Sequence, residues 1–113
     1  LIKGKVNSYS QIRDAGLWIK ENSEPENLII SSSAYQVMYY SKRKSILFPL
    51  TKEEYENDTL SKNPKYFMIS IFEGSPDWVN SYPQENNYTV SYIIFMDPEK
   101  TKPMVIVYEI NST

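Results

Sequence analysis

The sequence has 113 residues, of which 41% are hydrophobic, with 12 basic and 14 acidic residues. This length fits one domain with one hydrophobic core, and a formal net charge of -2 without long runs of either sign argues against a nucleic-acid partner. The lack of cysteine and histidine excludes disulfides, thiolate chemistry and serine–histidine or histidine–metal sites. We therefore expect a single domain over residues 1–113, without a metal or a cofactor.

The chain opens with a predicted helix and a short buried strand. Ser8 and Gln11 form a capping-box pattern, which predicts a helix that begins there after a lead-in. Asn22 in a left-handed conformation would end this helix, and Pro25 prevents its continuation. The apolar run Leu28–Ser31 then predicts a strand in the interior of a sheet.

A second helix and strand follow. The helix should begin at Ser33 and carry Tyr35, Met38 and Tyr39 on its apolar face. A basic cluster at residues 42–44 closes it, and we interpret these cations as a solvated helix end, where they complement the negative end of the helix dipole. Residues 45–48 are predicted to form the second strand.

The middle of the chain predicts a third helix and a third strand. A capping box at Thr51 and Glu54 would open an acidic helix through about Leu60, with Tyr55 as its core contact, before Asn63 and Pro64 turn the chain. Residues 66–72 give the strongest buried-strand pattern.

The C-terminal part reads as a short helix and a hairpin. Pro76 would start the helix, which carries Trp78, and Pro83 would stop it. Strands over 88–96 and 104–110 are predicted to pair across a charged, proline-containing connection.

Strands that alternate with helices indicate an α/β domain. We expect a three-layer sandwich whose sheet has about five strands and is mostly parallel, with a C-terminal antiparallel hairpin. A reversal of direction around the first strand would give the order 2-1-3-4-5. A crevice would then lie beyond the carboxyl ends of strands one and three.

This crevice would gather the only side chains that we consider as a ligand site: Ser31, Ser32, Ser33, Glu73, Ser75 and Asp77. Hydroxyls at a helix N-terminus can hold an anion or a sugar oxygen, but a cap at Ser33 beside strand-end serines is the favoured interpretation. Glu73 and Asp77 could form an acid/base pair or hold a hydrated cation; loop solvation is favoured because neither has a histidine or a third partner. No catalytic or metal-ligating residue is predicted.

Other motifs are interpreted as structural. Glu53, Glu54 and Glu56 should form a solvated helix face, and Trp18 and Trp78 should pack in the core rather than stack on a sugar. The three glycines are too scattered for a phosphate-binding loop. N-glycosylation acceptor patterns begin at Asn57, Asn87 and Asn111, and they would matter only on an extracytoplasmic protein.

A series of short motifs runs along most of the chain. The run DAGLWIKEN is followed by a proline, LIISSS, YYSKRK and LFP, and later by YFMISI, a proline–tryptophan segment and VIVYEI. The residues that carry its first half are Asp14, Ala15, Gly16, Trp18, Ile19, Asn22, Tyr40, Ser41 and Arg43. This series resembles the soluble C-terminal domain of multi-spanning GT-C glycosyltransferases of archaeal type, which are related to dolichyl-phosphate-mannose protein mannosyltransferases and lipid A aminoarabinose transferases.

The resemblance implies a noncatalytic extracytoplasmic domain that shapes acceptor access or supports the membrane core. In such enzymes the catalytic aspartate and the lipid-phosphate donor site lie in the membrane-embedded part, which would be the partner of this domain, together with a glycan, a lipid-linked sugar or a protein acceptor. Because the chain begins at Leu1 and not at methionine, we expect it to be cut from a longer protein. The alternatives are a stand-alone small-ligand or carbohydrate-binding module, and a small enzyme that uses Glu73 and Asp77.

Overall fold

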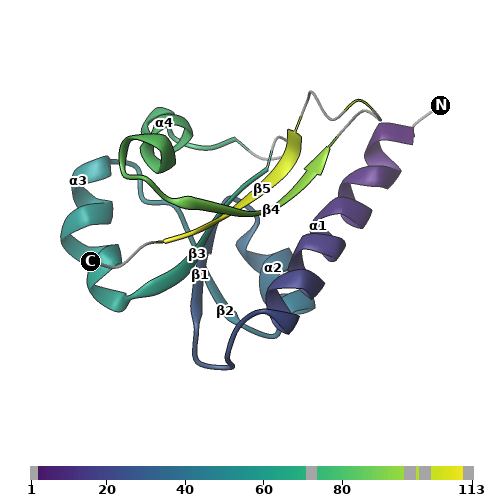
Figure 1. The fold of residues 1–113 in the computed structure, drawn as a ribbon, viewed down its shortest axis with the longest axis horizontal. Coiled ribbons are helices and arrows are strands. Elements are labelled where there is room, and N and C mark those ends of the chain that lie inside the picture. Colours follow the sequence, from purple (N-terminus) through teal and green to yellow (C-terminus); the bar gives the residue numbers. More distant parts are fainter. Residues whose placement is uncertain (1–2, 71–73, 96–98, 100–102, 111–113) are drawn as a thin grey trace.

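The chain forms a mixed α/β fold in which helices flank a five-stranded sheet (Figure 1). The computed structural model describes residues 3–70, 74–95, 99 and 103–110, with side chains from residue 11 onward. The helices are α1 (Lys3–Glu21), α2 (Ala34–Ser41), α3 (Lys52–Glu54) and α4 (Asp77–Glu85). The strands are β1 (Leu28–Ser31), β2 (Lys44–Leu47), β3 (Pro64–Ser70), β4 (Thr89–Phe95) and β5 (Pro103–Glu109). Within the described ranges, no helix has both the length and the apolar character needed to cross a membrane.

The strand order is β2-β1-β3-β5-β4. Strand β1 pairs in parallel with β2 and β3, as expected of an interior strand, whereas β5 pairs antiparallel with both β3 and β4. The antiparallel pairings are longer than the parallel ones, so the expectation of a mostly parallel sheet is wrong. The C-terminal antiparallel hairpin is confirmed, but its strands are exchanged relative to the predicted order 2-1-3-4-5. Strand β5 carries the continuous apolar run MVIVY, whereas Thr89 and Ser91 interrupt the apolar residues of β4, so β5 suits the interior place better.

Two clusters of buried side chains lie on opposite faces of the sheet. One joins α1 and α2 to β1, β3 and β5, and it includes Ile12, Ile19, Val37 and Met68. The other joins α4 and the turns after α3 to the neighbouring side chains of the same strands, such as Phe67. Successive strand residues point to opposite faces, so Phe67 and Met68 serve different clusters. Figure 1 shows α1 and α2 at one side of the strands and α3 and α4 at the other.

Helix α1 ends at Glu21, just before Asn22 as predicted, but its start and the conformation of Asn22 differ from the prediction. The helix begins at Lys3 and therefore passes through Ser8, so the capping box does not mark its start. The preceding residues include no proline, and a helix can extend through them. Asn22 is not left-handed, because the described non-glycine residues with positive φ are Lys42, Asn63 and Asn87. Its side-chain amide instead donates to the carbonyl of Trp18 at 2.8 Å and so satisfies one free carbonyl of the last turn.

Helix α2 turns a different face to the sheet from the one predicted. Tyr35 and Tyr39 are 79% and 67% exposed, so the prediction that they face the core is wrong. Ser33 stands at the N-cap, but its side chain makes no cap hydrogen bond. The residues of α2 that are buried are the small ones: Ala34, Val37 and Ser41. Small side chains let α2 lie close to the sheet and to α1, while a tyrosine tolerates exposure because its ring ends in a hydroxyl.

Helices α1 and α2 cross closely, and hydrogen bonds from Arg43 connect their carboxyl ends. A β-carbon added to Gly16 would lie 2.6 Å from the β-carbon of Tyr40, which is closer than a contact distance. The guanidinium of Arg43 donates to the carbonyls of Lys20 and Ser23, each at 2.9 Å, and to the Ser23 hydroxyl at 2.9 Å. The solvated interpretation of residues 42–44 therefore fails for Arg43, which caps the carboxyl end of α1.

The third helix and α4 are both irregular. The Thr51 hydroxyl accepts from the N–H of Glu54 at 3.1 Å, which confirms the predicted cap. The helix then widens into a π-helical turn, η1 (Tyr55–Thr59), and tightens into a 3-10 turn, η2 (Leu60–Lys62). Tyr55 is fully buried, as predicted. Pro83 lies inside α4, so the prediction that it stops the helix is wrong; little of the helix follows it, and few hydrogen bonds are lost.

Candidate functional site

Ser31, the last residue of β1, stabilises the turn into α2. Ser31 is fully buried, and its hydroxyl accepts a hydrogen bond from the N–H of Ser33 at 3.0 Å. Such a side-chain bond two residues ahead closes a serine turn without any ligand. Ser31 thus has a structural role, and it is Ser31, not Ser33, that supplies the local bond.

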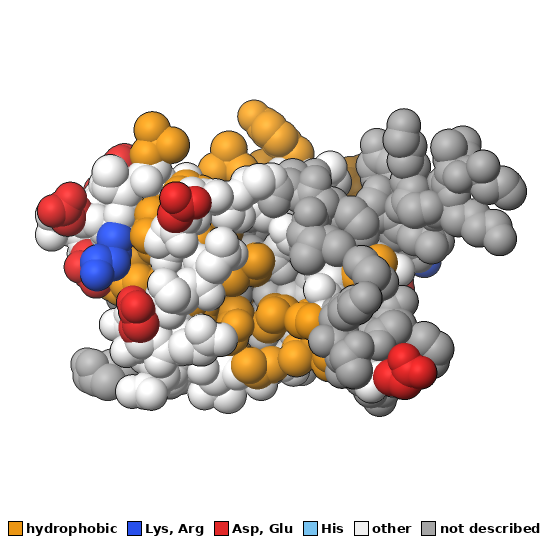
Figure 2. All heavy atoms as spheres, turned by 90° about the horizontal axis from the view of Figure 1, so that it is seen from above, with side chains coloured by type: hydrophobic (Ala, Val, Ile, Leu, Met, Phe, Trp, Pro, Cys, Tyr) orange, Lys and Arg blue, Asp and Glu red, His pale blue; other side chains and the backbone are white. Residues whose placement is uncertain are grey.

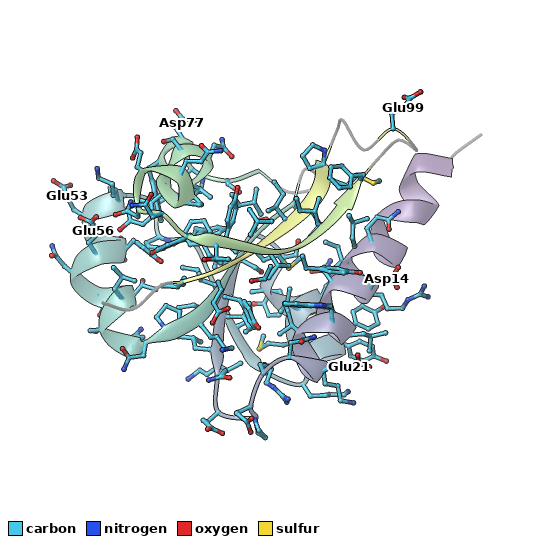
Figure 3. All side chains as sticks on the ribbon, viewed as in Figure 1. Asp14, Glu21, Glu53, Glu56, Asp77 and Glu99 are labelled. Atoms are coloured by element: carbon cyan, nitrogen blue, oxygen red, sulfur yellow. The ribbon has the colours of Figure 1, made fainter. Side chains whose placement is uncertain are left out.

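Of the other predicted site residues, Ser32, Ser33, Ser75 and Asp77 lie within the described ranges. The hydroxyls of Ser32 and Ser75 are buried and have no hydrogen-bond partner in the part of the chain that the structure describes. Glu73 lies outside the described residues, so its pairing with Asp77 stays a prediction. Asp77 is exposed at the first turn of α4, where a carboxylate complements the helix dipole, and it points away from the sheet (Figure 3).

The acidic residues after Thr51 divide into two kinds. Glu53 and Glu54 are exposed, as predicted for a solvated face. Glu56 is exposed as well, and its carboxylate also accepts a hydrogen bond from the hydroxyl of Tyr82 at 2.8 Å. No group of three or more acidic side chains that could hold a metal ion occurs within the described ranges.

Three tyrosines form a hydroxyl network in the core on the α4 side of the sheet. The hydroxyls of Tyr55 and Tyr88 lie 3.0 Å apart, and the rings of Tyr82 and Tyr88 meet with centroids 5.7 Å apart. Burial raises the pKa of Tyr55 well above its ordinary value of 10, and the hydrogen bond to Tyr88 raises it further. Burial and the hydrogen bond to Glu56 likewise raise the pKa of Tyr82. At neutral pH these phenols are uncharged, and their hydroxyls donate to fixed partners. Such groups form a rigid part of the core and are poorly suited to proton transfer.

A hollow of about 440 Å³ lies beside this network, in the size range of small-ligand sites. The side chains that line it come from the end of α4, from the turn that follows, and from two distant positions: Leu60, Tyr82, Glu85, Asn86, Asn87, Tyr88 and Ile110. A smaller hollow of about 270 Å³ lies at the start of β1 and β2, where Lys44 and Lys62 contribute to its lining.

The turn after α4 is held by its own backbone and amide groups. Asn86 donates from its N–H and from its side-chain amide to the carbonyl of Tyr82, both at 3.0 Å. The N–H of Tyr88 donates to the carbonyl of Pro83 at 2.9 Å. Asn87 takes a left-handed φ of 58°, which asparagine adopts more readily than most residues. Sequence patterns did not reveal the hollow; the only local signal was the run of glutamate and asparagines at 85–87 between a helix and a strand.

The tryptophans pack against the two core clusters, as predicted. Trp18 stacks on Tyr92 with centroids 5.1 Å apart and an interplanar angle of 12°. Trp78 packs among the aromatic rings on the other face and donates from its indole N–H to the carbonyl of Pro49 at 3.0 Å. Both tryptophan rings therefore contribute to the packing of the core.

The candidate acceptor asparagines for N-glycosylation lie in different settings. Asn57 is exposed within η1, while Thr59 of the same pattern is buried. Asn87 is exposed on the rim of the hollow. Asn111 lies outside the described residues.

The described side chains at the hollow offer aromatic surface and acceptor oxygens, which suit the binding of a ligand. No protein-family model, curated protein or solved structure matches the chain.

Proposed function

We propose that the chain is a noncatalytic extracytoplasmic domain of a membrane-bound glycosyltransferase, which moves sugar from a lipid-phosphate donor to an acceptor. The observation that carries this proposal is the position of the residues on which the resemblance to GT-C enzymes rests. Those that carry the first half of the resemblance meet in the fold at one place, the junction of α1, α2 and the adjoining strands.

The α1–α2 crossing accounts for several of these residues. Gly16 has no side chain where Tyr40 approaches, and Arg43 holds the end of α1 through the carbonyls of Lys20 and Ser23. The hydroxyl of Ser41 is buried and accepts from the N–H of Arg43 at 3.1 Å, which orients the arginine.

The contact of α1 with the sheet accounts for others. Trp18 meets the ring of Tyr66 edge-on with centroids 5.4 Å apart, and the Tyr66 hydroxyl donates to the carbonyl of Asn22 at 2.8 Å. Ala15 and Ile19 are buried on the face of α1 that packs in the core. Two domains of the same architecture would share the residues that fix the packing of a helix pair. Residues with this structural role also fit a domain that has no active site of its own.

The proposal takes the fold as a three-layer sandwich, which the two core clusters on opposite faces of the sheet support. In this proposal the partners are the membrane-embedded part of the same polypeptide and a glycan, a lipid-linked sugar or a protein acceptor. No nucleic-acid partner is proposed.

Cysteine labelling in the natural host tests this location. The chain has no cysteine, so Ser81→Cys on the exposed face of α4 adds one reactive thiol to it. We expect a membrane-impermeant maleimide to label this variant in intact cells, in a protein that sediments with membranes and whose reading frame encodes many hydrophobic segments before Leu1. Val79→Cys, which is buried on the same helix, serves as the control and should label only after unfolding.

Protection of Ser81→Cys until the cells are lysed, or a short reading frame without hydrophobic segments, would overturn the proposal. The second candidate function, a stand-alone carbohydrate-binding α/β module, would then be preferred. The hollow beside Tyr82 and Tyr88 favours that alternative, since it offers ligand-binding chemistry that does not depend on a membrane partner.

A further inference from the structure

We infer that the hollow at the end of α4 binds a neutral saccharide unit. This inference rests on the proposed function, or on its alternative, for the presence of a glycan near the domain. The site itself is argued from the side chains that form it.

The hollow combines aromatic and polar walls. Tyr82 and Tyr88 line one part of it, Leu60 and Ile110 add apolar surface, and Glu85 with the neighbouring asparagines provides polar atoms. Sugars present both apolar C–H faces and hydroxyl edges, so a site for them needs both kinds of wall. The volume of about 440 Å³ is ample for a sugar ring with its hydroxyls.

The hydroxyl of Tyr88 is already engaged within the protein. It lies 3.0 Å from the hydroxyl of Tyr55, and the ring packs on Phe67 with centroids 5.6 Å apart. The ring is half-buried, so the part that remains open to the hollow is carbon surface. Such surface attracts the C–H face of a sugar and offers no charge to an ion.

The polar atoms at the hollow are mainly acceptors. The carboxylate of Glu85 is exposed, and the amide nitrogen of Asn86 is used on the carbonyl of Tyr82, which leaves its oxygen to accept. No basic side chain is among the described residues that line the hollow. Seen from above, carboxylates outnumber basic groups among the charged side chains at the end of the molecule where α3 and α4 lie (Figure 2). An anion would be repelled here, whereas the hydroxyl groups of a neutral sugar can donate to these oxygens.

The site is formed before any ligand arrives. The turn of residues 86–88 is fixed by hydrogen bonds to the carbonyls of Tyr82 and Pro83, and Tyr82 is fixed by its bond to Glu56. Preformed walls reduce the entropy that binding must overcome, so that even a single sugar unit can be held with measurable affinity.

A nuclear magnetic resonance titration of the isotope-labelled 113-residue chain tests the inference. The probes are two neutral disaccharides, mannobiose and N,N′-diacetylchitobiose, with glucose 6-phosphate as an anion and spermidine as a cation. We expect at least one neutral disaccharide to shift the backbone amides of residues 85–88 in a saturable manner at millimolar concentration. The ionic probes should leave these amides unchanged.

Substitutions identify the groups responsible. Glu85→Gln removes the charge but keeps the shape of the side chain, and it should weaken binding about tenfold because a charged acceptor is lost. Glu53→Gln makes the same change at an exposed position that does not line the hollow, and it should have no effect.

Three outcomes would overturn the inference: no saturable shift with either disaccharide, shifts at residues away from the hollow, or equal affinities for Glu85→Gln and Glu53→Gln. Binding of spermidine instead of the sugars would also overturn it. Cysteine labelling reports separately on location. An external domain that binds no sugar refutes this inference alone, and an internal domain that binds sugar refutes only the membrane proposal.

Discussion

Replacing Gly16 with alanine tests the close crossing of α1 and α2. The added methyl carbon would lie 2.6 Å from the β-carbon of Tyr40 and 3.4 Å from the backbone nitrogen of Ser41. Ordinary carbon contacts begin near 3.5 Å, and a β-carbon cannot rotate away as a long side chain can. One helix must therefore move relative to the other by a substantial part of an ångström.

Two effects of this substitution oppose each other. Alanine is favoured over glycine in a helix interior by about 1 kcal/mol, which would stabilise α1. Overpacking at a close contact costs about 1–3 kcal/mol, and here the shift would also disturb the hydrogen bonds of Arg43 across the same junction. We expect the net result to be a loss of about 1–2 kcal/mol in the free energy of unfolding, and a melting temperature lower by roughly 5–10 °C.

Urea unfolding followed by tryptophan fluorescence measures this change, since Trp18 packs on the sheet from the same helix. Gly74→Ala is the matched control because a β-carbon there would meet nothing within 4 Å. That variant should be as stable as the parent or slightly more stable, through a less flexible unfolded state. If Gly16→Ala were equally stable, the close α1–α2 crossing would be refuted.

Two further predictions concern Ser32 and the buried tyrosines. Ser32→Ala removes a buried hydroxyl without a described partner and should raise the free energy of unfolding by about 1 kcal/mol in urea titrations; a loss of similar size would show that the hydroxyl has a partner. Burial, followed by hydrogen bonds to Tyr88 and Glu56, raises the pKa values of Tyr55 and Tyr82 above 10 in the folded chain. The unfolded chain therefore loses these protons first, so their contribution to stability is complete below pH 10 and declines as the pH rises above it. Tyrosinate absorbance and denaturant midpoints measured together check this, and full ionisation of all tyrosines before any loss of structure would contradict it.

Local patterns in the sequence were sufficient to predict the elements of the fold. The run LIIS predicted β1 with its correct bounds, because a short apolar segment between a proline turn and a serine cluster has few alternatives. The cap at Thr51 and the end of the third helical segment at Asn63 also depend on local sequence. The order of β4 and β5 was not predictable in this way, since either strand of a hairpin can lie against β3. The choice depends on which strand buries more apolar surface once the helices are in place.

The candidate site was less predictable than the fold. The serines were correctly placed after β1, but a sequence does not say whether a hydroxyl will bond a ligand or its own backbone, as Ser31 does. The hollow depends on Leu60, Tyr88 and Ile110, which are far apart in the sequence and meet only through the sheet and the turns after α3. Arg43 was placed at a helix end, yet most of its acceptors lie at the end of a different helix and just beyond it.

The interior position of β5 has a consequence for biosynthesis. It is the last of the five strands to leave the ribosome, yet it must lie between β3 and β4, which are made earlier. Until β5 emerges, β3 has one unpaired edge, and the core cluster on the α1 side lacks Val105 and Val107. Apolar surface on the nascent chain therefore stays exposed until β5 emerges, and chaperones that shield strand edges would be most useful in this interval.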